Sequence, residues 1–367
     1  MHDIPVFKFE SDPDLEQSLR AASDRVLTSG RYVLGTEAAG FEREFAEFCG
    51  VAECIGVANG TDALELALRA LGVGAGDRVA TVANAGFYSC AALSAIGAQP
   101  VFIDVDDTLT MSPERLREAG GELKAIIVTH LYGRLGHIDE IAAYAADRGL
   151  PVIEDCAQAH GASRGDKCAG SFGAVGCFSF YPTKNLGALG DGGAIVTSDP
   201  DLAARVRALR QYGWAAKYRV TLPGGRNSRL DELQAAFLRA KLSRLRRWNA
   251  ARVAIARRYC DALEGPDLVM PQWSGNEYVA HLFVVRTHDR DALRAALAAR
   301  GIGSEIHYPV PDHQQPIMIS SARPRLPMTE AACREVLSLP CYPGLADAQV
   351  DAVIDAVRFH YRGAATS

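Results

Sequence analysis

Two charged residues in the middle of the chain are placed so that they could act together in covalent catalysis. Asp155 ends the apolar run from Pro151 to Asp155, and Lys184 follows in a segment rich in glycine, serine and threonine. Open α/β sheets place ligand contacts at strand ends, and a buried carboxylate there needs a cationic partner. Partial desolvation lowers the pKa of a lysine and makes its amine nucleophilic. Pyridoxal phosphate (PLP) requires this pairing, because its aldehyde binds a lysine amine and its pyridinium nitrogen binds a carboxylate.

The common motifs of nucleotide and metal enzymes are missing from the sequence. The glycines from Gly72 to Gly76 fail the dinucleotide spacing G-x-G-x-x-G, and they precede a strand where that motif follows one. The chain has no P-loop and no H-E-x-x-H, and Asp104 to Asp107 lacks the glycine and final glutamate of a calcium loop. A Rossmann NAD site, nucleotide hydrolysis and metal catalysis are therefore disfavoured.

Composition predicts an ordinary globular protein of the cytoplasm with small, neutral or acidic partners. The 367 residues include 39 Lys and Arg against 44 Asp and Glu, a net charge of −5, which argues against binding nucleic acid or an anionic membrane. No apolar run approaches the roughly 18 residues of a membrane span, and the first ten residues lack the layout of a signal peptide. The nine cysteines are odd in number, scattered and never spaced C-x-x-C, so we expect free thiols in a reducing compartment and assign no metal site.

The elements that must position Asp155 and Lys184 alternate between short β-type runs and helical patterns. Such alternation is typical of an α/β fold with a mostly parallel sheet and crossover helices. The expected strands are residues 78–81, 100–104, 125–129, 151–155, 177–180 and 194–197. The expected helices between them are residues 62–71, 89–96 and 138–148.

The last third of the chain predicts a second, smaller unit. Residues 228–263 form one long, Arg-rich helical pattern, which we interpret as a helix connecting two domains. After Pro266 come a strand at residues 281–286, a helix at 291–300, a Pro-rich loop at 308–327 and a closing helix at 347–361. We therefore expect a large domain over residues 1–248, including an N-terminal segment, and a small α/β domain over residues 249–367.

Four long motifs identify a family that the chain resembles over nearly its full length. They are N-G-T-D-A-L-E-L-A-L, E-D-C-A-Q-A-H-G, S-F-Y-P-T-K-N-L-G-A-L-G-D-G-G and N-S-R-L-D-E-L-Q-A-A, in that order. In these motifs the chain resembles the DegT/DnrJ/EryC1/StrS family of PLP-dependent nucleotide-sugar aminotransferases. The resemblance implies a fold-type-I PLP transferase, with a mostly parallel central sheet flanked by helices, and a homodimer with shared active sites.

The resemblance also implies roles for individual residues. Lys184 is the implied catalytic lysine that binds PLP, Asp155 contacts the pyridine nitrogen, and Gln158 lies against the ring hydroxyl oxygen. The other implied cofactor-binding residues are Gly60, Thr61, Asp62 and Ser179 near the phosphate, with Asn227 reaching the phosphate in the neighbouring subunit. The implied substrate-binding residues are His160, Tyr181, His307 and Tyr308.

Each of these residues also has a plainer interpretation. Thr61 is a typical cap of the helix that follows it, although a helix N-terminus also binds phosphate. Ser179 alternates with aromatic residues in a strand, and Asn227 follows two glycines as a turn residue does. His160 is equally consistent with a core histidine. Residues 307–309 could form an ordinary surface loop.

The chain departs from the family after the strand that ends at Thr81. The family usually has P-S-F-T-F there, and its last aromatic stacks on the pyridine ring, whereas this chain has Val82 to Gly86 followed by Phe87 and Tyr88. Either Phe87 or Tyr88 is thus the expected stacking residue, and the alternative is that both pack into the core.

The motif around Lys184 resembles one branch of the family. Enzymes that aminate carbon 3 of a dTDP-linked 3-keto-6-deoxyhexose carry D-A-A-Q-A-H-G and S-F-Y-P-T-K-N-L-G-A, whereas those acting at carbon 4 tend to carry D-A-A-H-A and S-F-H-A-x-K. The chain matches the first set at Gln158, His160 and Tyr181, and the resemblance implies L-glutamate as the amino donor. The alternatives are amination at carbon 4 or of another nucleotide sugar, and a non-catalytic regulatory protein on the same scaffold. A sugar 3-dehydratase is disfavoured because it would replace Lys184 by histidine.

Overall fold

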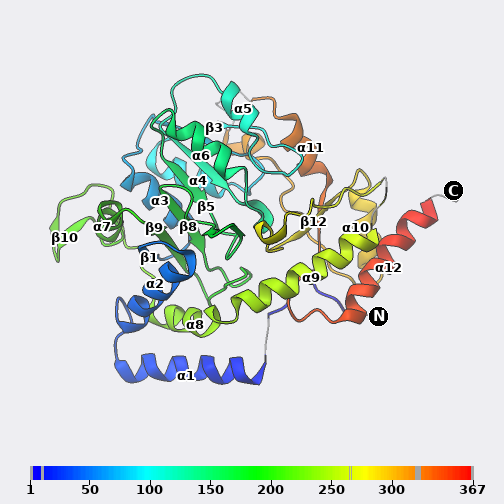
Figure 1. The fold of residues 1–367 in the computed structure, drawn as a ribbon, viewed down its shortest axis with the longest axis horizontal. Helices are drawn as coiled ribbons and strands as arrows, with labels where there is room; N and C mark the ends of the chain where they lie inside the picture. Colours follow the sequence, from blue (N-terminus) through cyan, green and yellow to red (C-terminus); the bar gives the residue numbers. More distant parts are fainter. Residues whose placement is uncertain (1–2, 10–11, 264, 266, 319–323, 365–367) are drawn as a thin grey trace.

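A computed structural model describes residues 3–9, 12–263, 265, 267–318 and 324–364 (Figure 1). Its central strands are β1 (Glu53–Val57), β2 (Arg78–Thr81), β3 (Gln99–Phe102), β4 (Ala125–Thr129), β5 (Val152–Asp155), β8 (Val175–Ser179) and β9 (Gly193–Thr197). They form one seven-stranded sheet in the order β1-β9-β8-β5-β4-β2-β3. β9 is antiparallel to both of its neighbours, whereas the pairs from β8 to β3 are parallel. The carboxyl ends of β8, β5, β4 and β2 therefore lie at the same edge of the sheet.

Helices cover both faces of this sheet. They are α2 (Thr36–Cys49), α3 (Gly60–Ala70), α4 (Tyr88–Ile96), α5 (Pro113–Glu118), α6 (Ile138–Ala146), α7 (Pro200–Leu209) and α8 (Glu232–Leu242), whereas α1 (Pro13–Ser29) packs against α8 outside this layer. Ile127 and Ile153 pack in one apolar cluster with α3, α4 and α7, whereas Ile126 and Val128 pack in another cluster with α6. Burial on both faces explains why these strands are continuously apolar.

A second apolar core lies beside the first. It is built from α9 (Leu245–Leu263), α10 (Arg290–Ala298), α12 (Asp347–Ala364) and the antiparallel pair β12 (Phe283–Arg286) and β13 (Val336–Leu339). In Figure 1, α9 runs from the side of α8 towards α10 and α12. The predicted α/β fold, with a mostly parallel sheet and a smaller C-terminal α/β part, is confirmed. The domain boundary between residues 248 and 249 stays a prediction, and its outer limits at residues 1 and 367 lie outside the described residues.

Three expectations differ from the structure in detail. The helix expected over residues 228–263 is two helices, α8 and α9, because the chain turns at Ser243 and Arg244, where the Arg244 N–H bonds the Lys241 carbonyl at 2.9 Å. Strand β1 was not expected, since its five residues include a glycine and a cysteine and carry a weak β signal. The Pro-rich loop holds two short turns, η3 (Asp312–Gln314) and η4 (Pro316–Met318), and ends at α11 (Pro327–Glu335); its residues 319–323 lie outside the described part.

The remaining elements are two or three residues long. They are β6 (Ser163–Arg164), β7 (Lys167–Cys168), β10 (Trp214–Ala216), β11 (Arg219–Val220), η1 (Leu131–Gly133) and η2 (Gly275–Glu277). All nine cysteines are free thiols. Over the described residues, every helix is too short or too polar to cross a membrane.

Candidate active site

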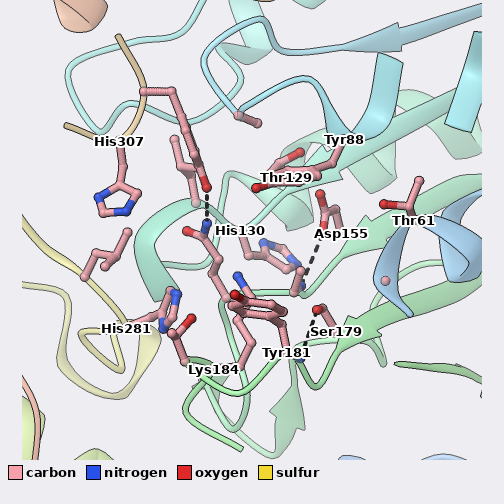
Figure 2. A pocket seen from close by; sticks show the side chains of 18 of the residues that line it. Thr61, Tyr88, Thr129, His130, Asp155, Ser179, Tyr181, Lys184, His281 and His307 are labelled. Carbon is pink, nitrogen blue, oxygen red and sulfur yellow. Dashed lines mark hydrogen bonds between the residues drawn. The ribbon is translucent and has the colours of Figure 1, made fainter. Parts of the chain in front are cut away.

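A cavity of about 650 Å³ lies between the carboxyl edge of the central sheet and the second core (Figure 2). Ser179, Asp155 and Thr129 are the last residues of β8, β5 and β4, and all three line it. The opposite wall comes from the second core and the segments beside it, including His281 and His307. Of the predicted site residues, those that line the cavity are Gly60, Thr61, Tyr88, Asp155, Gln158, Ser179, Tyr181, Lys184, His307 and Tyr308.

The N-terminus of α3 forms an anion-binding corner of the cavity. Asn59 caps the helix, because its side-chain oxygen accepts the Asp62 N–H at 2.8 Å. Gly60 lies so close to β8 that a Cβ at this position would be 2.7 Å from the Cβ of Ser179. The Thr61 and Ser179 hydroxyls and the unpaired N–H groups of the first helical turn thus share a small polar corner that suits a phosphate.

Lys184 follows β8 in a tight turn, in which its N–H donates to the Tyr181 carbonyl at 2.8 Å. Burial lowers the pKa of Lys184 to about 8, although the nearby carboxylate of Asp155 opposes this shift. Burial likewise raises the pKa of Asp155, against the N–H of Ala157 and the charge of Lys184. Desolvation therefore dominates the pKa of both groups, and the opposite charge of each partly offsets the shift of the other.

Gln158 joins the sheet edge to the opposite wall. Its side-chain oxygen accepts the Tyr132 N–H at 2.6 Å, and its amide nitrogen donates to the Tyr308 hydroxyl at 3.1 Å. The ring of Tyr308 packs against the backbone at Gly86, where a Cβ would be 2.8 Å from the ring. One hydrogen of the Gln158 amide remains for a ligand in the cavity.

The two candidates for ring stacking point in different directions. Phe87 has a left-handed backbone, φ 72°, and its N–H donates to the Asp312 carboxylate at 2.9 Å. Tyr88 lines the cavity, is 50% exposed, and meets the Tyr308 ring edge-on at 6.2 Å. Of the two, the structure brings Tyr88 to the cavity.

Four predicted site residues do not line the cavity. Asp62 faces the Arg226 guanidinium at 3.4 Å, and Phe87 is held by Asp312 as described. His160 is fully buried beside the Phe178 and Phe180 rings, and burial together with the Lys184 charge lowers its pKa to about 3. Asn227 lies on the exposed surface, bridged to Gln211.

His160 therefore matches the core-histidine interpretation more closely than a direct substrate contact. Gln158 and His160 belong to one motif, but the chain turns after Asp155, so Gln158 faces the cavity and His160 packs against the aromatic core. Sequence spacing alone carries no information about this turn.

Several lining residues were not predicted. They include the polar residues Asn59, Thr129, His130, Thr183, Asp191, His281 and Glu305, as well as Val6 and Phe7 from the N-terminal segment. His281 was assigned to the start of an apolar strand, whereas β12 begins two residues later, at Phe283. A lone histidine directly before an apolar strand was the available signal for this residue.

One group of potential metal ligands among the described residues adjoins the cavity through His130. Ligand atoms of His130, Glu154 and Cys156 come within 4.8 Å of one another. The Glu154 carboxylate accepts the N–H groups of Gly170 and Gly173 at 2.8 and 2.7 Å, and it meets Nε2 of His130 at 2.9 Å. Nδ1 of His130 accepts a hydrogen bond from the Gly136 N–H, so the ring proton is on Nε2. The Nε2–H group therefore donates a hydrogen bond to the Glu154 carboxylate. This arrangement is a satisfied hydrogen-bond network that fixes β4 to β5.

The cavity has the donor set that PLP requires. A buried carboxylate at Asp155, a desolvated amine at Lys184 and an anion corner at α3 lie in one space. The buried hydroxyl of Thr129 has no hydrogen-bond partner among the described residues and also lines the cavity. Residues and space therefore fit this cofactor.

Comparison with known proteins identifies the family. The profile of the DegT/DnrJ/EryC1/StrS aminotransferase family matches residues 13–358. The chain belongs to this family. It is 46% identical to the dTDP-3-amino-3,4,6-trideoxy-alpha-D-glucose transaminase of Streptomyces venezuelae over 352 residues, covering 93% of each chain. It is 45% identical to the dTDP-3-amino-3,6-dideoxy-alpha-D-galactopyranose transaminase of Aneurinibacillus thermoaerophilus, covering 94% of this chain and 96% of the relative.

A solved structure agrees with this assignment. The crystal structure of Streptomyces venezuelae DesV in complex with a ketimine intermediate matches with a TM-score of 0.91 at 46% identity, covering 94% of this chain and 95% of DesV. The resemblance seen in the sequence is thus confirmed. The protein is an aminotransferase of a PLP-dependent family, an enzyme that transfers nitrogenous groups.

Proposed function

We propose that this aminotransferase moves an amino group from L-glutamate to carbon 3 of a dTDP-linked 3-keto-6-deoxyhexose, with PLP as its cofactor. The observation that carries the proposal is the meeting of Lys184, Asp155 and the N-terminus of α3 in one cavity. The names of the two relatives, both transaminases of dTDP-3-amino sugars, support carbon 3 and the dTDP group.

Different residues of the cavity would bind different parts of the cofactor. Asp155 would face the ring nitrogen, and Gln158 would donate its free amide hydrogen to the ring hydroxyl oxygen. The corner of Gly60, Thr61 and Ser179 would hold the phosphate. When bound, PLP supplies an electron sink that stabilises negative charge on the carbon next to the amino group. Tyr88 would stack on its ring.

The chemistry left to the chain is mainly proton transfer at Nζ of Lys184. Because burial lowers the pKa of this amine to about 8, both its charged and neutral forms are populated near neutral pH. The amine can therefore accept a proton from one carbon and return it to another. Asp155 keeps a proton on any nitrogen base that it contacts, since an opposite charge favours the protonated form.

The sugar would occupy the side of the cavity lined by Tyr181, His307 and Tyr308. A cavity of about 650 Å³ lies within the range of roughly 300–1,000 Å³ that small-molecule sites span. The 52% exposed ring of Tyr181 lies at the cavity mouth, next to the turn that carries Lys184.

We also propose that the protein works as a homodimer with shared active sites in the cytoplasm. Asn227 lies on a surface that also exposes apolar side chains of the β10–β11 region, with Tyr218 79% and Val220 59% exposed. Exposed apolar residues gathered in this way are typical of an interface. Nine free thiols favour a reducing compartment, and the net charge of −5 disfavours nucleic acid as a partner.

Two half-reactions test this function separately. PLP-loaded protein is first mixed with L-glutamate, and we expect release of one 2-oxoglutarate per site with a change in the visible spectrum. The product sugars dTDP-3-amino-3,6-dideoxy-α-D-galactopyranose and dTDP-3-amino-3,4,6-trideoxy-α-D-glucose are then supplied with 2-oxoglutarate, and formation of glutamate is measured. A parallel panel of 4-amino and UDP-linked sugars tests the alternative substrates.

Borohydride trapping links the activity to Lys184. Reduction should fix the cofactor covalently to Lys184 in the wild-type protein, and Lys184→Ala should bind it only noncovalently and lose turnover. A trapped adduct in Lys184→Ala would contradict the lysine assignment. Absence of 2-oxoglutarate release from the wild-type protein would favour the non-catalytic alternative.

A further inference from the structure

His281 lines the cavity near Lys184 without a role in the chemistry described so far (Figure 2). It is 6% exposed, and its Nδ1 lies 3.0 Å from the side-chain oxygen of Asn185, the residue that follows Lys184. The loop that carries the reactive amine is thus hydrogen-bonded directly to this imidazole.

Two buried amides determine which nitrogen of His281 carries the proton. The amide nitrogen of Asn249 donates to the His160 carbonyl at 2.8 Å, so the Asn249 oxygen faces Asn185. The Asn185 amide nitrogen donates to that oxygen at 2.8 Å and to the Val279 carbonyl at 3.2 Å. Because backbone carbonyls only accept, both amide orientations are fixed, and the Asn185 oxygen must face the imidazole. Nδ1 of His281 is therefore the donor.

The other ring nitrogen, Nε2, consequently presents a lone pair to the cavity. The described residues provide no hydrogen-bond partner for Nε2, whose ring lines the open space. Burial lowers the pKa of the His281 imidazole and so keeps the ring neutral. The charges of Lys184 and Arg252 lower this pKa further, and His160 and His307 have a smaller effect in the same direction. Arg252 also holds the backbone here, since it donates to the His281 carbonyl at 3.3 Å.

The chemistry of this wall selects a hydrogen-bond donor as its ligand. Lys184 is the only lysine or arginine among the described residues that line the cavity, and Glu305 adds an anion to the lining. A carboxylate of the amino-acid substrate would meet the lone pair of His281 with no proton to share, which is unfavourable. A sugar hydroxyl can donate to the lone pair without any charge change, and its own oxygen can still accept elsewhere.

We propose that His281 recognises the sugar, its Nε2 accepting a hydrogen bond from a ring hydroxyl beside the carbon that receives the amino group. This inference rests on the proposed function, because it needs a sugar in the cavity. Asn185 and Asn249 act as positioning residues that hold the acceptor form of the ring. The residue therefore contributes to sugar specificity and leaves the amino-acid half-reaction unaffected.

Two substitutions separate the acceptor from the structural hydrogen bond. In His281→Asn, the shorter amide can still donate to Asn185 but offers no acceptor at the position of Nε2. In His281→Gln, the longer side chain can place an oxygen near the position of Nε2 but loses the bond to Asn185. His288→Gln, at a side chain that is 96% exposed, is the matched control.

The measurement is kcat/KM for the two product sugars, alongside the rate of the glutamate half-reaction and the melting temperature of each PLP-loaded variant. We expect His281→Asn to lower kcat/KM for the sugar about tenfold, the usual effect of one lost hydrogen bond. Its glutamate half-reaction should stay within about twofold of the wild type. His281→Gln should lose less sugar activity than His281→Asn, even where its melting temperature is lower.

The two sugars differ by the oxygen at carbon 4, so they show which hydroxyl is involved. A loss confined to the 3,6-dideoxy sugar supports recognition of the carbon 4 hydroxyl, and an equal loss with both sugars supports the carbon 2 hydroxyl. Unchanged sugar kinetics in His281→Asn, or a larger loss in His281→Gln, would overturn the proposal. Failure of the proposed function is distinct, because the wild-type protein itself would then release no 2-oxoglutarate or reject both sugars.

Discussion

Replacing the buried lysine by an uncharged side chain of similar length should stabilise the cofactor-free protein near neutral pH. In Lys184→Met the aliphatic part of the side chain is retained while the charge is removed. The folded protein keeps the Lys184 ammonium in a desolvated cavity, which lowers its pKa from 10.5 to about 8. The buried ammonium of Lys184, which the reaction needs, therefore lowers the free energy of unfolding of the cofactor-free protein.

The size of the effect follows from that shift in pKa. At about 1.4 kcal/mol per pH unit, the cost of the charged amine is about 3 kcal/mol below pH 8. The cost disappears as the pH rises from about 8 to 10.5, because the unfolded chain holds the proton over this range and the folded chain does not. Asp155 loses its nearest cation in the variant, so we expect a net gain of about 1–3 kcal/mol at pH 7.

Urea unfolding of the cofactor-free proteins at pH 7, 8, 9 and 10 measures this difference. Lys241, whose pKa burial also lowers to about 8, titrates in both proteins, so its contribution cancels in the comparison. Lys241→Met is the contrasting control, since Lys241 donates to the Gly187 carbonyl at 2.7 Å and its removal leaves that carbonyl unpaired. A stability gap between Lys184→Met and wild type that stays constant from pH 7 to 10 would refute the desolvation argument.

Two further predictions concern Asp155 and the dimer. Asp155→Asn should melt close to the wild-type temperature but lose about 100-fold or more of its activity, because a neutral amide cannot hold a proton on the cofactor nitrogen. If the variant instead has a lowered melting temperature and normal specific activity, Asp155 is a structural residue. If Asn227 completes the site of the neighbouring subunit, mixing Asn227→Ala with Lys184→Ala subunits should restore activity towards half the wild-type value per hybrid dimer, since one site then carries both defects and the other neither. No recovery despite demonstrated subunit exchange would show that both residues serve one subunit's site.

Sequence patterns predicted the sheet edge of the site well. The strands ending at Thr81 and Thr129 have the expected limits, and Asp155 ends a strand as expected, because continuous apolar runs between glycines and charged residues are strong local signals. Gly60, Thr61 and Ser179 come together because β1 and β8 end at one edge. This part of the cavity follows from local patterns and from the geometry of a parallel sheet.

The direction of side chains in irregular segments was not predictable in the same way. Phe87 and Tyr88 are neighbours of similar size, and of the two only Tyr88 lines the cavity; the backbone of Phe87 is left-handed, and its N–H donates to the carboxylate of Asp312, 225 residues away. For a similar reason, the two alternatives for His160 could not be decided from the sequence, and His281 was expected only as the start of a strand. His160 packs against aromatic rings of the core. His281 is hydrogen-bonded to Asn185, which lies 96 residues away in the sequence, so no local pattern could predict this contact.

Hydrogen bonds fix the wall that carries Tyr308 to the sheet edge. The Asp312 N–H donates to the Ala83 carbonyl at 2.7 Å, its carboxylate accepts the Phe87 N–H at 2.9 Å, and Gln158 reaches the Tyr308 hydroxyl at 3.1 Å. Bonds that join the two walls hold reacting groups at set positions, which lowers the entropy cost of bringing a substrate to Lys184. Because these bonds use backbone groups and a few polar side chains, other side chains of the wall can differ without loosening it. Discrimination between sugars at such a site then depends on single acceptors such as His281, whose orientation is fixed by the same kind of buried network.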